Sequence, residues 1–232
     1  MSSRLDSLSV RLAVEKLEFR LSQPGIRKLP GSLPRTPLAT SEVASLAFID
    51  RRSHRRFGAG VVDFQRFGGL LGCVTQRHVA DAPFPKYAYG SAGNLYPIQT
   101  YVYAKGQCLE KIGAGYYYHD PAAHSLVALS ESPALEPWRF GPNRPVFERA
   151  AFGLFLVAHM DAITPMYGDT AMRFACIEAG LMTQLLELTA AKVQIGMCQL
   201  GGGDFRDLAT RFLLASSDVL VHTLLGGLPE AP

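Results

Sequence analysis

Lys-Tyr-Ala-Tyr-Gly-Ser-Ala-Gly-Asn-Leu-Tyr-Pro, residues 86–97, is the stretch of this chain that says most about its fold. The small residues at 90–93 would let a backbone approach a flat ligand closely, because little or no side chain stands in the way. Lys86, Tyr87 and Tyr89 could carry protons beside such a ligand. The same composition also suits an ordinary loop before a strand, so the rest of the chain has to decide.

Length and composition are those of a globular protein. The 232 residues suffice for one large domain or two small ones, with 48% apolar and 19% charged residues. The net charge of +3 is too small to predict a nucleic-acid partner. We expect no signal peptide and no apolar window of about 18 residues, and hence a cytoplasmic protein without membrane contact.

The four cysteines lie far apart and form no Cys-x-x-Cys pair, and the six histidines show no ligand spacing. Neither a metal site nor a dithiol redox motif is therefore expected. Cys198 lies among glycines and could be partly exposed.

Hydrophobic periodicity predicts helices and strands in an irregular alternation, which indicates an α+β fold with a central sheet. Residues 1–40 are expected to form a helix and a Pro-rich arm, and residues 41–232 the main domain. Helices are expected at 3–22, 41–50, 63–75, 170–191 and 205–213, and strands at 98–104, 115–119, 125–129, 152–158, 193–200 and 219–225.

A dense arginine cluster, Arg51-Arg52-Ser53-His54-Arg55-Arg56, follows the predicted helix at 41–50. Several guanidinium groups and a hydroxyl in so few residues can hold a phosphate through charge-assisted hydrogen bonds. The alternative is a solvated helix end, where cations are favoured by the helix dipole. The dipole does not explain Ser53 or the abrupt density of arginines.

The two segments together resemble the nitroreductase-like flavoproteins, and the form Ser91–Pro97 resembles their SagB-type dehydrogenase branch. Later patterns fit that branch as well: Gly115 to Tyr118 with Asp120-Pro121, Met166-Tyr167-Gly168, Arg173-Phe174 and Glu178-Ala179-Gly180. The resemblance implies a central, mostly antiparallel sheet flanked by helices. It also implies a homodimer with FMN at the interface, which the apolar helix at 170–191 would suit.

A narrower similarity is to the oxidase domains of nonribosomal peptide synthetases, which oxidise thiazoline or oxazoline rings to thiazoles or oxazoles. It is carried by Lys16–Arg27, the Lys86-Tyr87 pair and Gly196–Gly202, and the resemblance covers about residues 10 to 228. One departure is Gly90, where the branch often has proline.

The resemblance implies a set of cofactor-binding residues. The arginine cluster would contact the FMN phosphate and ribityl chain, and the small-residue segment would lie against the isoalloxazine ring. The loop after residue 196 would run along the flavin edge, although a tight turn after a strand explains its glycines equally well. The implied residues are Arg51, Arg52, Ser53, Arg55, Ser91, Ala92, Gly93, Asn94, Gly196, Met197, Gly201 and Gly202.

Ring aromatisation needs a base, and Lys86, Tyr87 and Tyr89 are the candidates. A free lysine is a poor base near neutral pH because its pKa is about 10.4, so burial would have to lower it. Tyr87 could act only if a cation such as Lys86 stabilises its phenolate. In an extended segment Tyr87 and Tyr89 would share one side and Lys86 the other, whereas a turn would break that rule. Lys86 could also be an ordinary surface lysine.

These observations lead to one functional expectation with two alternatives. We expect FMN-dependent dehydrogenation of a thiazoline or oxazoline tethered to a carrier protein, with dioxygen as the oxidant. An NAD(P)H-dependent nitro- or quinone reductase on the same fold is the first alternative. A non-catalytic module that binds a partner is the second.

Overall fold

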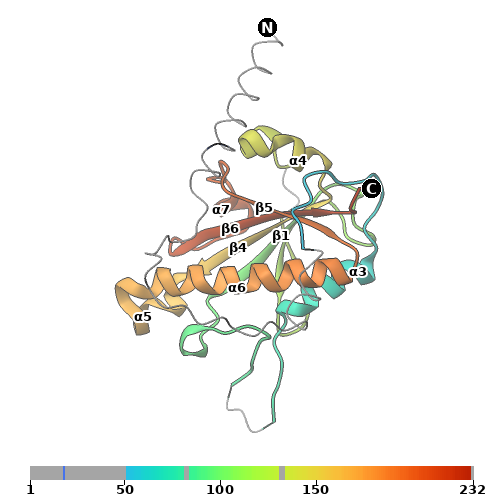
Figure 1. Cartoon of the computed structure of the whole chain (residues 1–232). Helices are drawn as coiled ribbons and strands as arrows, with labels where there is room; N and C mark the ends of the chain where they lie inside the picture. Colours follow the sequence, from blue (N-terminus) through green and yellow to red (C-terminus); the bar gives the residue numbers. More distant parts are fainter. Residues whose placement is uncertain (1–17, 19–50, 81–83, 131–133, 231–232) are drawn as a thin grey trace, which may run out of the picture. The chain divides into compact units, whose positions relative to one another are not determined.

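The computed structural model describes residues 18, 51–80, 84–130 and 134–230 (Figure 1). The chain divides into two compact units, Met1–Glu42 and Val43–Pro232, and almost all described residues belong to the second. Apart from residue 18, the predicted helices at 3–22 and 41–50 and the arm at 1–40 lie outside the described residues. They stay predictions.

Within the described residues, six strands form one sheet in the order β3-β2-β1-β4-β6-β5, and each neighbouring pair is antiparallel. This confirms the expected α+β class with its mostly antiparallel central sheet. The strands are β1 Ile98–Ala104, β2 Gly115–Asp120, β3 Ser125–Ser130, β4 Phe152–His159, β5 Gly196–Leu200 and β6 Asp218–Gly227.

The central strand β4 explains why the sheet is covered on both faces. Seven of its eight residues are buried, as the continuous apolar run predicts. Its residues Phe152, Leu154 and Leu156 pack into one hydrophobic cluster, while Phe155 packs into a second cluster on the opposite face. Alternation along the strand therefore divides the core into two layers.

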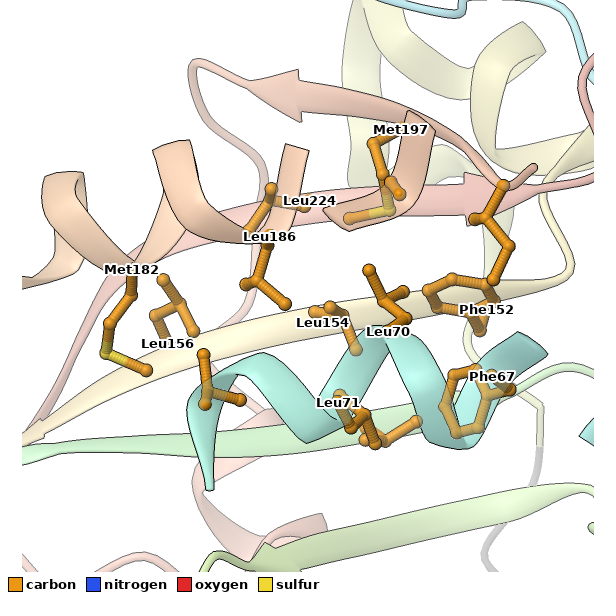
Figure 2. Close-up of a cluster of buried hydrophobic side chains, with 14 of the residues drawn as sticks. Phe67, Leu70, Leu71, Phe152, Leu154, Leu156, Met182, Leu186, Met197 and Leu224 are labelled. Atoms are coloured by element: carbon orange, nitrogen blue, oxygen red, sulfur yellow. The ribbon is translucent and has the colours of Figure 1, made fainter. Parts of the chain in front are cut away.

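The first layer lies under α3, Phe64–Leu71, and the long α6, Ala171–Lys192, which run along the same face of the sheet (Figure 1). Asp63 caps α3 by accepting a hydrogen bond from the Arg66 amide, 3.0 Å away. Figure 2 shows how the apolar side chains of the two helices and of strands β4, β5 and β6 converge. The helices predicted at 63–75 and 170–191 are thus confirmed.

The second layer contains α4, Arg144–Arg149, and α7, Leu208–Arg211, and is rich in aromatic side chains. The Phe140 and Phe147 rings stack with centroids 4.0 Å apart. The remaining short helices are α5 Thr164–Tyr167, η1 Gly72–Val74, η2 Ala92–Asn94, η3 Pro137–Asn143, η4 Met160–Ala162 and η5 Gly168–Thr170.

Two predicted element boundaries and one predicted exposure are wrong. Strand β5 begins at Gly196 rather than 193, because Val193 caps α6 and Gln194 takes a positive φ of 56°. The helix predicted at 205–213 shrinks to the four residues of α7. Cys198 is buried rather than partly exposed, since it packs in the second layer.

The apolar character of α6 also corrects the expectation that no window could span a membrane. Residues Thr164–Lys192 are long and apolar enough to do so by composition alone. Within the fold, however, nine residues of α6 are buried, among them Ala175, Met182 and Leu186. A core helix satisfies the same composition test.

Candidate functional site

The stretch 86–97 is an extended loop whose start is fixed to a neighbouring segment. Lys86 exchanges two backbone hydrogen bonds with Arg77, at 2.7 and 2.8 Å. Tyr87 and Tyr89 point to the same side with ring centroids 5.4 Å apart, and Tyr89 is buried, while Lys86 is exposed. The alternation expected for an extended segment therefore holds, and it separates the lysine from both tyrosines.

Asn94 holds the Lys86 side chain. The Lys86 Nζ donates to Asn94 Oδ1 over 2.6 Å, and the Tyr96 hydroxyl donates to the same oxygen over 3.1 Å. The Asn94 amide group in turn donates to the carbonyl of Pro85 over 3.4 Å. The amide oxygen thus accepts two hydrogen bonds and the amide nitrogen donates one, so the position of the lysine ammonium group is defined by the loop itself.

A buried carboxylate on α6 anchors the middle of the loop. Ser91 Oγ accepts a hydrogen bond from the Tyr96 amide over 2.9 Å, and the Ser91 hydroxyl bonds to Glu178. Glu178 Oε1 also accepts from the Ile98 amide over 3.2 Å. Burial raises the pKa of Glu178 to about 7, against the pull of these two hydrogen bonds.

The two tyrosines lie in surroundings that disfavour a phenolate. Burial raises the pKa of Tyr87 to about 12, and the neighbouring Tyr118 and Tyr96 add to this. Burial also raises the pKa of Tyr89, helped by the charge of Glu178. Both groups are therefore neutral phenols at ordinary pH, which suits a proton donor better than a base.

Gly93 is required by its backbone and by its neighbours. Its φ is +60°, and a Cβ there would lie 2.9 Å from both Met166 Sδ and the Tyr167 hydroxyl. The position that a Cβ of Gly93 would occupy is therefore filled by side chains of α5. Ala92 and Asn94 complete the short η2 turn beside it.

The arginine segment packs against the edge strand β5. The His54 amide donates to the carbonyl of Met197 over 2.8 Å, and a Cβ on Gly196 would come within 3.0 Å of the His54 ring. Arg51, Arg52 and Arg55 remain exposed and Ser53 is partly exposed. A cavity of about 440 Å³ opens here, lined by Arg51, Arg52, His54, Ala191, Gln194, Ile195 and Pro229.

Two polar side chains of α6 are buried without hydrogen-bond partners among the described residues, and one of them, Glu187, lies beside this segment. They are Thr183, through Oγ1, and Glu187, through both carboxylate oxygens. The Glu187 side chain is only 3% exposed, and its nearest cation is the Arg51 guanidinium at 3.5 Å. Buried polar atoms almost always have partners, so these atoms are candidates for contacts that the described residues do not supply.

The glycines after β5 differ in their surroundings. A Cβ on Gly201 or Gly202 would meet no atom within 4 Å, whereas one on Gly203 would collide with Phe205. Close packing within the chain therefore explains Gly203. It does not explain Gly201 and Gly202, which border open space.

The predicted site residues fall into two groups along α6. Lys86, Tyr87 and Ser91 gather near Glu178, whereas Arg51 lies near Glu187. The two glutamates are nine residues apart, which is about two and a half helical turns and 13 Å, so they face opposite sides of the helix. Among the described residues, no hydrogen bond, ion pair or ring contact joins the two groups.

A larger cavity of about 690 Å³ lies elsewhere, between α3 and the hairpin β2–β3. It is lined by Phe64, Gly68, Tyr117 and the pair His119–His124, among others. Burial lowers the pKa of His119 to about 4, so that histidine is neutral. This cavity contains none of the predicted site residues.

Sequence reasoning missed Glu178, Thr183 and Glu187 as members of the site. One signal was available, because an acidic side chain interrupts the apolar pattern of 170–191 at 178 and at 187. In a helix buried on most sides, such residues need a partner.

Comparison with known proteins identifies the class of this protein. A family model described as "Nitroreductase family" matches residues 49–227, and the chain belongs to this family. Its members generally bind flavin. The expected nitroreductase-like fold is thereby confirmed.

Two curated relatives are both named indigoidine synthase. That of Dickeya dadantii is 24% identical over 200 residues, which cover 76% of this chain and 12% of the relative. That of Streptomyces lavendulae is 27% identical over 207 residues, which cover 74% of this chain and 15% of the relative. The chain thus spans a small fraction of each relative's length.

Two solved structures share the fold. The microcin synthetase McbBCD complex of Escherichia coli with truncated pro-MccB17 bound gives a TM-score of 0.72 at 16% identity, covering 91% of this chain and 81% of that chain. The nitroreductase CinD of Lactococcus lactis in complex with chloramphenicol gives a TM-score of 0.54 at 12% identity, covering 80% of this chain and 89% of that chain.

Proposed function

We propose that this protein is an FMN-dependent oxidase that converts a carrier-protein-bound thiazoline or oxazoline to the thiazole or oxazole. The observation that carries the proposal is the arginine-lined cavity next to Glu187, whose carboxylate lies 3.5 Å from Arg51 and has no hydrogen-bond partner among the described residues. It combines cations for a phosphate with acceptors for hydroxyl groups, and FMN carries both kinds of group.

The residues present fit FMN. Arg51 and Arg52 line a cavity without a carboxylate in its wall, which suits a phosphate. Glu187 and Thr183 offer buried acceptors that would receive hydrogen bonds from ribityl hydroxyls. Ser53, Arg55 and the Gly196–Gly202 segment flank this side and complete the proposed binding set.

We further propose that a second copy of the chain completes the site. The segment 86–97 and the arginine segment approach opposite sides of α6, so one flavin cannot easily contact both within a single chain. The outer side of α6 carries Ile177 and Leu181, which are 51% and 45% exposed. Apolar side chains on such a helix suit a homodimer interface, as in obligate dimers.

In this proposal, residues of the 86–97 loop carry out the proton transfer. Lys86 is exposed and held by Asn94, so its amine can face a substrate ring. Tyr87 is the weaker candidate for the base because burial raises its pKa to about 12. Lys86 would accept the proton from the acidified α-carbon, whereas Tyr87 and Tyr89 lie on the other side of the loop and would not take part in this transfer.

The bound flavin would supply the oxidation, since it accepts the hydride that leaves the neighbouring ring carbon. The ring then loses two electrons and two hydrogens in total, one as the proton held by Lys86. Dioxygen would be the final oxidant. The names of the two indigoidine synthases and of the microcin synthetase complex support a place in natural-product biosynthesis.

Mass spectrometry tests this function. The full-length protein is reconstituted with FMN and incubated in air with a carrier protein loaded with a thiazoline. We expect a loss of two hydrogens from the carrier-bound group. The proposal fails if the mass stays unchanged while NAD(P)H rapidly reduces the flavin, a result that would favour the nitro- or quinone reductase.

A further inference from the structure

A continuous set of hydrogen bonds links the buried carboxylate of Glu178 to the amine of Lys86. It starts on α6, where Glu178 binds the Ser91 hydroxyl. Ser91 Oγ then accepts from the Tyr96 amide over 2.9 Å. At the other end of Tyr96, its hydroxyl and the Lys86 amine both donate to Asn94 Oδ1, over 3.1 and 2.6 Å.

We propose that Glu178 is a positioning residue for Lys86, acting through Ser91, Tyr96 and Asn94. The inference rests on the proposed role of Lys86 as the proton acceptor. Glu178 itself is 2% exposed and so does not reach a substrate. It would instead determine where the loop places the lysine amine.

The loop needs such an anchor because its backbone is strained. Asn94 and Tyr96 have φ values of +59° and +49°, in a region that side chains other than glycine rarely adopt. Conformations of this kind persist only where surrounding contacts hold them. Glu178 holds both sides of Tyr96, through Ser91 before it and through the Ile98 amide after it.

The anchor lies on a rigid element. Glu178 belongs to the 22-residue helix α6, and its neighbours Ala175, Ala179 and Met182 are buried in the first core layer. Side chains on packed helices hold a functional group more accurately than loop contacts alone. The loop is therefore anchored to the hydrophobic core through α6, and not only by contacts within the loop.

The Asn94 end of this set of hydrogen bonds suits an amine that must act as a base. Asn94 presents an uncharged amide oxygen to Lys86. Such an acceptor orients one N–H bond, and hence the lone pair of the neutral amine, without adding a negative charge that would hold the proton on nitrogen. A carboxylate at position 94 would do the opposite.

Chemical labelling of the full-length protein tests the positioning without using enzyme activity. Acetylation of Lys86 by acetic anhydride is measured by mass spectrometry relative to the exposed Lys192 in the same sample. We expect Glu178→Gln and Ser91→Ala to raise this ratio about three- to tenfold, because Lys86 is no longer held.

A matched control and a second variant keep the test decisive. Glu110 also accepts a hydrogen bond from a backbone amide, that of Phe64, at 3.1 Å, and Glu110→Gln should leave the ratio unchanged. Ser91→Ala tests the link if Glu178→Gln does not fold. An unchanged ratio in a folded variant of either residue overturns the proposal, as does an equal rise in Glu110→Gln.

A double-mutant cycle on turnover separates this inference from the proposed function. Glu178→Gln should keep FMN and lower kcat about tenfold, and it should have no further effect in the Lys86→Ala background, since coupled residues are not additive. Full additivity would overturn the positioning role. Wild-type turnover by Lys86→Ala would instead remove Lys86 from the reaction, and the labelling ratio would still decide whether Glu178 positions it.

Discussion

Glu178 and Glu187 lie on the same helix and are both almost fully buried, but only Glu178 has hydrogen-bond partners among the residues that the structure describes. Glu178 accepts from the Ile98 amide and binds Ser91. Glu187 has no hydrogen-bond partner among the described residues and lies 3.5 Å from the Arg51 guanidinium.

The difference indicates two kinds of role. A carboxylate whose bonds are complete stabilises the structure around it, which here is the loop that carries Lys86. A carboxylate with free oxygens beside a cationic cavity is better explained by a ligand that supplies donors. The comparison therefore supports the proposal that the 86–97 loop serves proton transfer and that the region around Glu187 serves binding.

Replacement of Lys86 should have the largest effect on the reaction. We expect Lys86→Ala to bind FMN normally and to lose about 10²- to 10⁴-fold in turnover, the usual range for a positioned acid or base. Lys111→Ala is the control, since that lysine is 67% exposed and far along the sequence from the loop. Loss of FMN from Lys86→Ala would show that the two regions are not separate.

Replacement of Arg51 should affect binding instead. Arg51→Ala removes charge-assisted hydrogen bonds to the phosphate, which corresponds to roughly 10- to 100-fold weaker FMN binding. Arg56→Ala is the matched control, because Arg56 pairs with Glu230 at 3.0 Å and does not line the cavity. Flavin fluorescence gives both dissociation constants, and equal values for the two variants would contradict the assignment.

The raised pKa of Glu178 predicts a smaller effect on stability. The native carboxyl keeps its proton up to about pH 7, whereas an unfolded glutamate loses it near its ordinary value of 4.5. The stabilisation from this group is thus complete at low pH and is lost as pH rises through 7, on the order of 2 to 3 kcal/mol.

Urea unfolding between pH 5 and 8 measures this effect. The unfolding free energy of the wild-type protein should fall with pH relative to Glu178→Gln, which cannot ionise. Glu110→Gln should follow the wild-type curve. A constant difference between wild type and Glu178→Gln would show that the carboxyl ionises at its ordinary pKa in the native state.

Local sequence patterns predicted the strands of the sheet well and the ends of individual elements poorly. The alternation at Ile98–Ala104 and the apolar run at 152–158 identified β1 and β4, because burial repeats along a strand. The start of β5 was misjudged because the positive φ of Gln194 depends on packing rather than on residue type. The shortness of α7 has the same origin, since tertiary packing overrides helix propensity.

The residues of the candidate site were likewise predicted only in part. Lys86 and the arginines were found because charged and small residues cluster in the sequence. The link from Lys86 to Asn94 was not, since a hydrogen bond between side chains eight residues apart leaves no pattern. Glu178 and Glu187 were hidden within an apolar helix, and only the surroundings of each distinguish an anchor from a ligand acceptor.

One titration tests the central claim most directly, that the unpartnered Glu187 marks the flavin site. FMN is added to wild-type and Glu187→Gln apoprotein, and the quenching of flavin fluorescence is followed. The account predicts saturation at one FMN per chain in the wild type and about tenfold weaker binding in the variant, because an amide is a poorer acceptor for ribityl hydroxyls. Equal dissociation constants, or no saturable binding by the wild type, would contradict it.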